Sequence, residues 1–176
     1  KTRRSGKRIY AQLQTASSAD YLLALACDQI VMPESGVLMI PGVRTEMLFY
    51  RDLLEKLGIE ADMLQMGDFK GAAEPYTRSK MSDSFRKQYE LVVDDIYDQT
   101  IDQIATDRRM DRARVKELID VGMHTAKDAF DAGLIDQVVF EDGLFDTLKK
   151  ELNVEELAVM EKYGRQKVDA NFSGMG

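Results

Sequence analysis

The sequence predicts an α/β fold, in which short strands alternate with helices in packed layers. Two β-rich runs, Gln29–Met32 and Val37–Ile40, are separated by a turn that contains proline and glycine. Farther along, apolar residues recur at helical spacing for about six turns from Asp83. The chain has 176 residues, 44% of them apolar, which is enough to bury the core of one domain or of most of one.

The first half of the chain is expected to alternate strands and helices. Ile9–Leu13 is expected to be a strand, and Ser17–Ala26 a helix that is too apolar to lie at the surface. Leucines at helical spacing predict a helix over Glu46–Leu57, which Gly58 ends. Ile59–Met66 is expected to be a further strand, and the loop after it delivers a lysine.

The second half is expected to be mainly helical. Asp111 is expected to cap a helix that follows the long one. Thr125 and Asp128 form a capping-box-like pair that begins a short helix. Leu134–Phe140 is expected to be a strand and Gly143–Leu152 the closing helix.

Composition excludes several classes of function. With 24 basic and 31 acidic side chains the net charge is −7, which argues against nucleic acid as the main partner. The longest apolar stretches are far shorter than the ~20 residues of a membrane-spanning helix. Cys27, the only cysteine, cannot form an internal disulfide or, beside a single histidine, a zinc site, and we expect it to be a small buried side chain. We expect one domain over residues 1–160 and a polar tail or linker over residues 161–176.

The nucleophile chemistry that the residues allow is narrow. His124, the only histidine, would have to carry any Ser-His-Asp triad, and we expect it to be an ordinary polar residue that faces solvent. A Ser-Lys pair needs a lysine whose pKa falls from ~10.4 towards 7–8 by desolvation. Lys70 has small apolar neighbours, so we expect it to be buried. Ser18 lies where an apolar helix begins, and amides there could hold an oxyanion. The residues alone leave other serine–lysine pairs open.

The stretch from Ala16 to Tyr21 and the stretch Gly67–Tyr76 carry two distinctive motifs. They resemble those of the signal peptide peptidase A (protease IV) family of Ser-Lys peptidases. The first resembles the family's A-S-G-G-Y-Y segment, and anchoring on Tyr21 and Asp28 places Ser18 at the nucleophile. Ala19 would then offer its amide to the oxyanion. The stretch Gly67–Tyr76 resembles G-x-x-K-x-A-x-E-P-F, whose lysine is the general base, and this places that role on Lys70. The resemblance extends from about Ile9 to Leu152 in the family's order.

The resemblance implies a fold and a function. The fold would be a spiral of β-β-α modules of the Clp-protease/crotonase kind, whose first modules precede Lys1. The function would be a membrane-associated serine endopeptidase outside the cytoplasm that degrades remnant signal peptides or other apolar peptides. Lysine and serine meet across repeats or subunits in this family, which implies a homo-oligomer. The resemblance implies no metal, cofactor or nucleic acid, and allows a membrane anchor outside this chain.

Three departures from the family pattern keep alternatives open. Ala19-Asp20 replaces a glycine pair, and Ile40 stands where a small hydroxyl residue helps to orient the lysine. Gly36–Tyr76 resembles the N-terminal repeat of the family's long form, in which that repeat supplies the lysine and the other repeat the serine. The alternatives are a catalytically inactive crotonase-like protein that binds peptides or partners, and an acyl-CoA enzyme of the wider crotonase fold.

Overall fold

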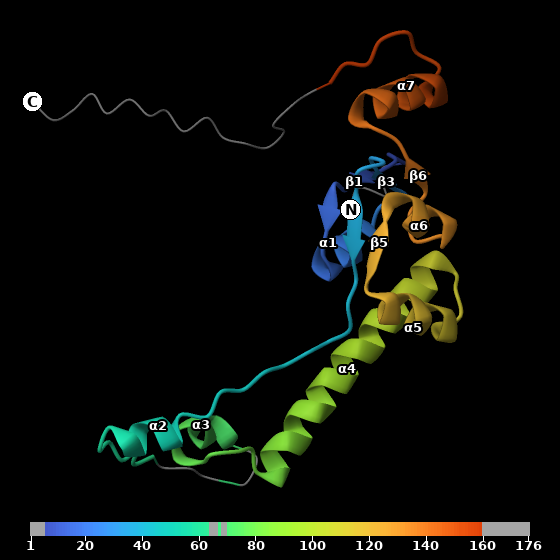
Figure 1. Cartoon of the computed structure of the whole chain (residues 1–176). Coiled ribbons are helices and arrows are strands. Elements are labelled where there is room, and N and C mark those ends of the chain that lie inside the picture. Colours follow the sequence, from blue (N-terminus) through green and yellow to red (C-terminus); the bar gives the residue numbers. More distant parts are fainter. Residues whose placement is uncertain (1–5, 64–66, 68–69, 160–176) are drawn as a thin grey trace, which may run out of the picture. The chain divides into compact units, whose positions relative to one another are not determined.

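The computed structural model describes residues 6–63, 67 and 70–159 of the chain (Figure 1). Its contacts divide the chain into two compact units, Lys1–Val139 and Phe140–Gly176, which are treated separately below. The expected tail over residues 161–176 lies outside the described residues, and the single domain over residues 1–160 stays a prediction.

Two three-stranded sheets form the centre of the first unit. One sheet is parallel throughout and has the order β1 (Tyr10–Gln12), β3 (Gln29–Met32), β6 (Gln137–Val138). The other has the order β2 (Thr15–Ala16), β4 (Val37–Met39), β5 (Met123–Thr125). In this second sheet β2 and β4 are parallel, whereas β5 is antiparallel to β4.

The strands are distributed as β-β-α modules require. β1 and β2 enter different sheets and are followed by α1 (Ser18–Ala24); β3 and β4 again enter different sheets and are followed by helices. A third pair, β5 and β6, flanks α6 (Ala126–Asp131) and also divides between the sheets. The predicted α/β fold and its spiral of strand pairs are therefore confirmed. The core between these elements includes the fully buried side chains of Tyr21, Val31 and Leu38.

The longest helix, α4 (Asp83–Arg108), begins where the sequence predicts and is one continuous rod (Figure 1). Ser82 caps it, because the Ser82 hydroxyl accepts the Phe85 N–H at 3.1 Å. The predicted apolar face is fully covered only at its ends: Phe85 is buried near the start, and Ile101 and Ile104 are buried in the core. Its middle is only partly covered, with Val92 50% and Ile96 46% exposed.

Among the described residues, three short helical segments lie between β4 and α4. They are α2 (Arg51–Lys56), η2 (Gly71–Ala73) and α3 (Glu74–Thr77). The predicted helix over Glu46–Leu57 is thus reduced to its second half, and its leucines Leu48, Leu53 and Leu57 are exposed. The predicted strand over Ile59–Met66 is wrong for its described part, because residues 59–63 pair with no strand. Helical spacing without an apolar surface to pack on gives only a short helix here.

The segment after α4 confirms some predictions and corrects others. α5 (Arg112–Val121) begins after Asp111 as expected, but the Asp111 side chain makes no capping hydrogen bond. His124, expected at the surface, lies on β5 with only 4% of its area exposed, and its Nε2 is 2.9 Å from the Leu118 carbonyl oxygen. The prediction failed because His124 points inward on a strand that the sequence did not reveal. Thr125 caps α6 as predicted, with its hydroxyl accepting the Asp128 N–H at 3.2 Å.

Smaller differences concern element ends. The predicted strand over Leu134–Phe140 is reduced to β6, because Leu134 and Ile135 turn into the core. Cys27 lies just beyond α1 and is only partly buried, so its expected full burial is wrong. In the second unit, α7 (Glu141–Leu152) starts two residues before the predicted helix. Within the described residues, every helix is too short or too polar to cross a bilayer.

Candidate functional site

Ser18 lies at the first position of α1, directly after the residue that caps the helix. The cap is Ser17, whose hydroxyl accepts the Asp20 N–H at 3.4 Å and donates to the Asp20 carboxylate at 2.6 Å. The Asp20 carboxylate in turn accepts the Ser17 N–H at 2.9 Å, which completes a capping box. The two neighbouring serines are therefore distinguished: Ser17 is used structurally, whereas the Ser18 hydroxyl has no hydrogen-bond partner among the described residues.

The first turn of α1 carries both a donor and a negative charge. Ala19 is exposed, and its N–H is one of the first-turn amides that have no partner within the helix. Asp20 follows it, and hydrogen bonds from Ser17 hold the pKa of Asp20 below its usual value. Its carboxylate therefore stays ionised at neutral pH. A fixed negative charge one residue from Ala19 opposes the build-up of an oxyanion at that amide.

Tyr21 fixes α1 to the core. Its buried hydroxyl donates to the Leu134 carbonyl at 2.7 Å and accepts from Arg108 Nε at 3.3 Å. Burial is the main cause that raises the pKa of Tyr21 to about 12. Arg108, at the last turn of α4, also pairs with Asp136 at 2.8 Å. The Asp136 carboxylate accepts the Ile30 N–H at 2.7 Å, so one network joins α1, α4 and β3.

Lys70 directly precedes η2, near the other end of α4. Its side chain is exposed, so the expectation that it is buried is wrong for one chain: its small neighbours leave the ammonium open to water. Its backbone N–H donates to the Gly67 carbonyl at 3.2 Å. Across the described part of the chain the Lys70 ammonium has no ion-pair partner, and Glu74 turns its carboxylate elsewhere. The amine is therefore accessible to a substrate or to another chain.

An apolar groove of about 780 Å³ opens beside Lys70. Its walls come from η2, α3 and the first turns of α4, with Met47 added from the preceding segment. Phe85 and Tyr89 stand edge to face in one wall, with ring centroids 4.8 Å apart. Tyr76 and Val92 border the groove as well. An apolar side chain would bury its surface here beside a primary amine.

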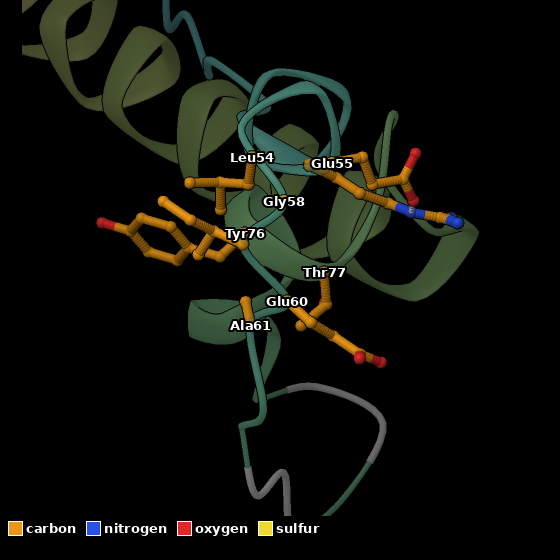
Figure 2. A pocket seen from close by; sticks show the side chains of 9 residues that line it. Leu54, Glu55, Gly58, Glu60, Ala61, Tyr76 and Thr77 are labelled. Atoms are coloured by element: carbon orange, nitrogen blue, oxygen red, sulfur yellow. Dashed lines mark hydrogen bonds and ion pairs between the residues drawn. The ribbon is translucent and has the colours of Figure 1, made fainter.

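A second pocket, of about 590 Å³, is bordered by α2, the segment after it and α3 (Figure 2). Tyr76 is shared by both cavities and stacks on Tyr50, with ring centroids 5.9 Å apart. Figure 2 shows Tyr76 on one side of this pocket and the carboxylates of Glu55 and Glu60 on the other. Glu55 pairs with Arg51 at 2.8 Å. The pocket thus combines an aromatic wall with a charged rim.

One chain does not bring Lys70 and Ser18 together. The residue after Lys70, Gly71, packs against Phe85 at the start of α4, whereas Tyr21, three residues after Ser18, contacts Arg108 at its end. At 1.5 Å per residue these two contacts lie about 35 Å apart along the helix. A general base must reach its proton donor to within about 3 Å, so no Ser18–Lys70 pair forms inside one chain.

Comparison with known proteins identifies the family. Residues 1–155 match the model of peptidase family S49, and the chain belongs to that family. It is 32% identical over 147 residues to an Enterococcus faecium protein named as a signal peptide peptidase SppA. The match covers 84% of this chain and 42% of that protein. The resemblance read from the motifs at Ser18 and Lys70 is therefore confirmed at the level of the family.

Two further relatives are longer proteins. The chloroplastic serine protease SPPA of Arabidopsis thaliana is 26% identical over 87% of this chain and 23% of its own length. Protease 4 of Salmonella typhi is 26% identical over 97% of this chain and 27% of its own length. The chain thus spans between about a quarter and two fifths of the relatives named here.

Sequence reasoning missed two functional contacts around these sites. Glu74 was not among the predicted site residues, but it is buried and bonded to Ser82. The serine before the helix at Asp83 was the signal that could have indicated this contact. Arg108 was not predicted either, because no local pattern indicates its contact with Tyr21, which lies 87 positions earlier in the chain.

Proposed function

We propose that the protein is a serine endopeptidase and that this chain supplies its general base, Lys70. The substrates would be apolar peptides, remnant signal peptides among them, cut at a membrane surface outside the cytoplasm. The single observation that carries the proposal is the position of Lys70, exposed at the edge of an apolar groove, within a family-S49 chain. A peptide with an apolar side chain would place its backbone next to the amine.

The reaction follows from the chemistry of a serine–lysine pair. Neutral Lys70 Nζ takes the proton of the serine hydroxyl as the oxygen attacks the peptide carbonyl. The C–N bond then breaks, the leaving amine takes that proton, and an acyl-serine ester remains. Water, deprotonated in turn by the lysine, hydrolyses the ester and restores the serine. No metal or cofactor enters these steps.

The active state requires more than one copy or repeat. A lysine becomes a base near neutral pH only when it is desolvated, and Lys70 is exposed in one chain. Ser18 lies at the opposite end of α4, so the serine that Lys70 activates must come from a neighbour. Among the serines of this sequence, Ser18 of a second copy is the candidate for the nucleophile. The contact would also bury Lys70.

Exposed apolar side chains support such a contact. On α4, Leu91, Val92 and Ile96 are 61%, 50% and 46% exposed, and Val92 also lines the groove of Lys70. On α1, Leu23 is 76% exposed one turn after Ala19. Docking the α1 face of one copy on the α4 face of the next would bury both apolar surfaces and bring a serine towards Lys70.

A second candidate function is peptide binding without cleavage. Asp20 favours it, because its ionised carboxylate stands in the first turn of α1, where the family carries glycine. The groove would still bind an apolar peptide. Labelling by a fluorophosphonate, which reacts only with an activated serine, separates the two candidates.

The test is to label full-length protein with a fluorophosphonate and assay cleavage of an apolar signal peptide. We expect Lys70→Ala and Lys70→Arg to lose both labelling and cleavage by 10²-fold or more, at about the scale of general-base catalysis. Arginine fails because a guanidinium does not deprotonate in this range. The matched control is Lys80→Ala, an exposed lysine outside the groove, which keeps full activity.

Three results would contradict the proposal. Appreciable activity of Lys70→Arg would exclude Lys70 as the base. Absence of labelling in the full-length wild-type protein, together with binding of the same peptide, would establish the peptide-binding function. Retention of coenzyme A on purification would instead indicate an acyl-CoA enzyme.

A further inference from the structure

We infer that Glu74 is a positioning residue for Lys70, and that it acts by joining the lysine segment to the first turn of α4 through Ser82. The inference rests on the proposed function, in which Lys70 is the general base. Glu74 would set where the amine stands without touching the substrate.

The carboxylate of Glu74 is the most buried acidic group of the described residues. Only 3% of the residue is exposed. One carboxylate oxygen accepts the Ser82 N–H at 2.8 Å, and the other accepts the Ser82 hydroxyl. Arg78 Nε stands 4.0 Å from the carboxylate, at its open side. Burial of a carboxylate removes its hydration, which is unfavourable unless hydrogen bonds replace the lost water, as the bonds from Ser82 do here.

Ser82 transmits this contact to α4. Its hydroxyl also accepts the Phe85 N–H at 3.1 Å and so caps the helix. Glu74 lies in the first turn of α3, so its carboxylate links the start of α3 to the start of α4. The position beside the positive end of α4 favours a negative charge there.

A second contact restrains the backbone that follows Lys70. Gly71 follows Lys70 and packs so closely on the Phe85 ring that a Cβ at this position would overlap it. Lys70 therefore directly precedes a segment, residues 71–74, that is held at both ends by α4. Release of either end would let the backbone of Lys70 move relative to the groove.

The geometry argues against the simpler role of Glu74 as a charge partner. Both carboxylate oxygens are directed at Ser82, and the described residues include no Lys70–Glu74 ion pair. A charge partner and a positioning residue respond differently to a neutral isostere. Glutamine keeps an acceptor for the Ser82 N–H and a donor for the Ser82 hydroxyl, but removes the charge.

The experiment uses four variants of the full-length protein: Glu74→Ala, Glu74→Gln, Ser82→Gly and, as the matched control, Glu90→Ala, which removes an exposed glutamate farther along α4. Glycine at position 82 keeps most of the helix-capping preference and removes the hydroxyl that Glu74 accepts from. Amide hydrogen exchange over residues 70–78 and steady-state kinetics are measured on each. The exchange measurement does not depend on catalysis, so it tests the inference even if the protein does not cleave peptides.

We expect Glu74→Ala and Ser82→Gly to speed exchange over residues 70–78 at least tenfold, and Glu74→Gln and Glu90→Ala to leave it near wild type. In the kinetics, Glu74→Ala should lower kcat up to about 10²-fold with little change in KM, as for a misplaced catalytic group. Glu74→Gln should restore most of kcat. Equal losses in Glu74→Gln and Glu74→Ala would overturn the inference and make Glu74 a charge partner. Unchanged exchange in Glu74→Ala would overturn it as well.

Discussion

At the scale of single residues, Gly71 shows how the absence of a side chain shapes the candidate site. The Phe85 ring occupies the space that a Cβ at position 71 would need. The ring also forms part of the groove and packs edge to face on Tyr89. Glycine thus allows the lysine segment to approach α4 closely.

Gly71→Ala is therefore expected to destabilise the protein by about 1–3 kcal/mol, because the ring must move to admit a methyl group. Urea unfolding measures the change. Gly42→Ala is the matched control, since a Cβ there would meet only Ile119 at 4.0 Å, and it is expected to stay within about 0.5 kcal/mol of wild type. Equal stability of the two variants would show that the Phe85 ring yields freely.

Single residues also show what the sequence could and could not reveal. The cap at Thr125 was predictable, because capping depends on residues three positions apart, whereas Asp111 directly precedes α5 without a capping hydrogen bond from its side chain. The burial of His124 was not, since it depends on pairing of β5 with β4, a strand more than 80 positions earlier. The roles of Lys70, Ser18 and Ala19 stay predictions.

At the scale of elements, the network around Arg108 determines how α4 meets the core. Arg108 joins Tyr21 of α1 to Asp136, which in turn bonds to β3. The helix pattern in the sequence correctly predicted α4 from Asp83. It could not show that the middle of the apolar face stays only partly covered, because that depends on where other elements lie. The same reason explains why α2 is shorter than its leucine spacing suggests.

The Tyr21 phenol makes this network sensitive to alkaline pH. Burial raises its pKa to about 12 from 10.0, so the folded chain keeps the proton between these values while the unfolded chain loses it. The stabilisation is complete below pH 10 and is lost as the pH rises through 12, by about 2–3 kcal/mol.

Urea unfolding of wild type and Tyr21→Phe at pH 9 and pH 11 measures this effect, because the other titrating groups are common to both proteins. The difference in stability between the two proteins should shrink at pH 11. A difference that is the same at both pH values would contradict the assigned pKa of Tyr21.

At the scale of the whole molecule, the two candidate site residues belong to surfaces at opposite ends of α4. A contact that pairs Ser18 of one copy with Lys70 of another can be isologous, which gives a two-fold dimer with two such pairs, or heterologous, which gives a ring or an open chain of copies. In either arrangement each proposed active site takes its serine from one copy and its lysine from another.

Mixing two inactive variants of the full-length protein tests this arrangement. Ser18→Ala and Lys70→Ala should each be inactive alone, whereas co-assembled equal amounts should recover about one quarter of wild-type activity, since random neighbours pair two intact groups at one contact in four. Recovery without co-assembly would contradict the arrangement. Full activity of Ser18→Ala alone would exclude Ser18 as the nucleophile. The nucleophilic serine would then belong to a second repeat.

Because α4 is long, a small change in its tilt displaces its far end by a large distance. Lys70 is attached near one end and the Arg108–Asp136 pair holds the other, about 35 Å away. A tilt of only about 5° at the anchored end swings the far end by about 3 Å, the whole length of a hydrogen bond. The rigidity of the contact between Arg108 and Asp136 therefore limits how accurately the distant Lys70 amine is positioned.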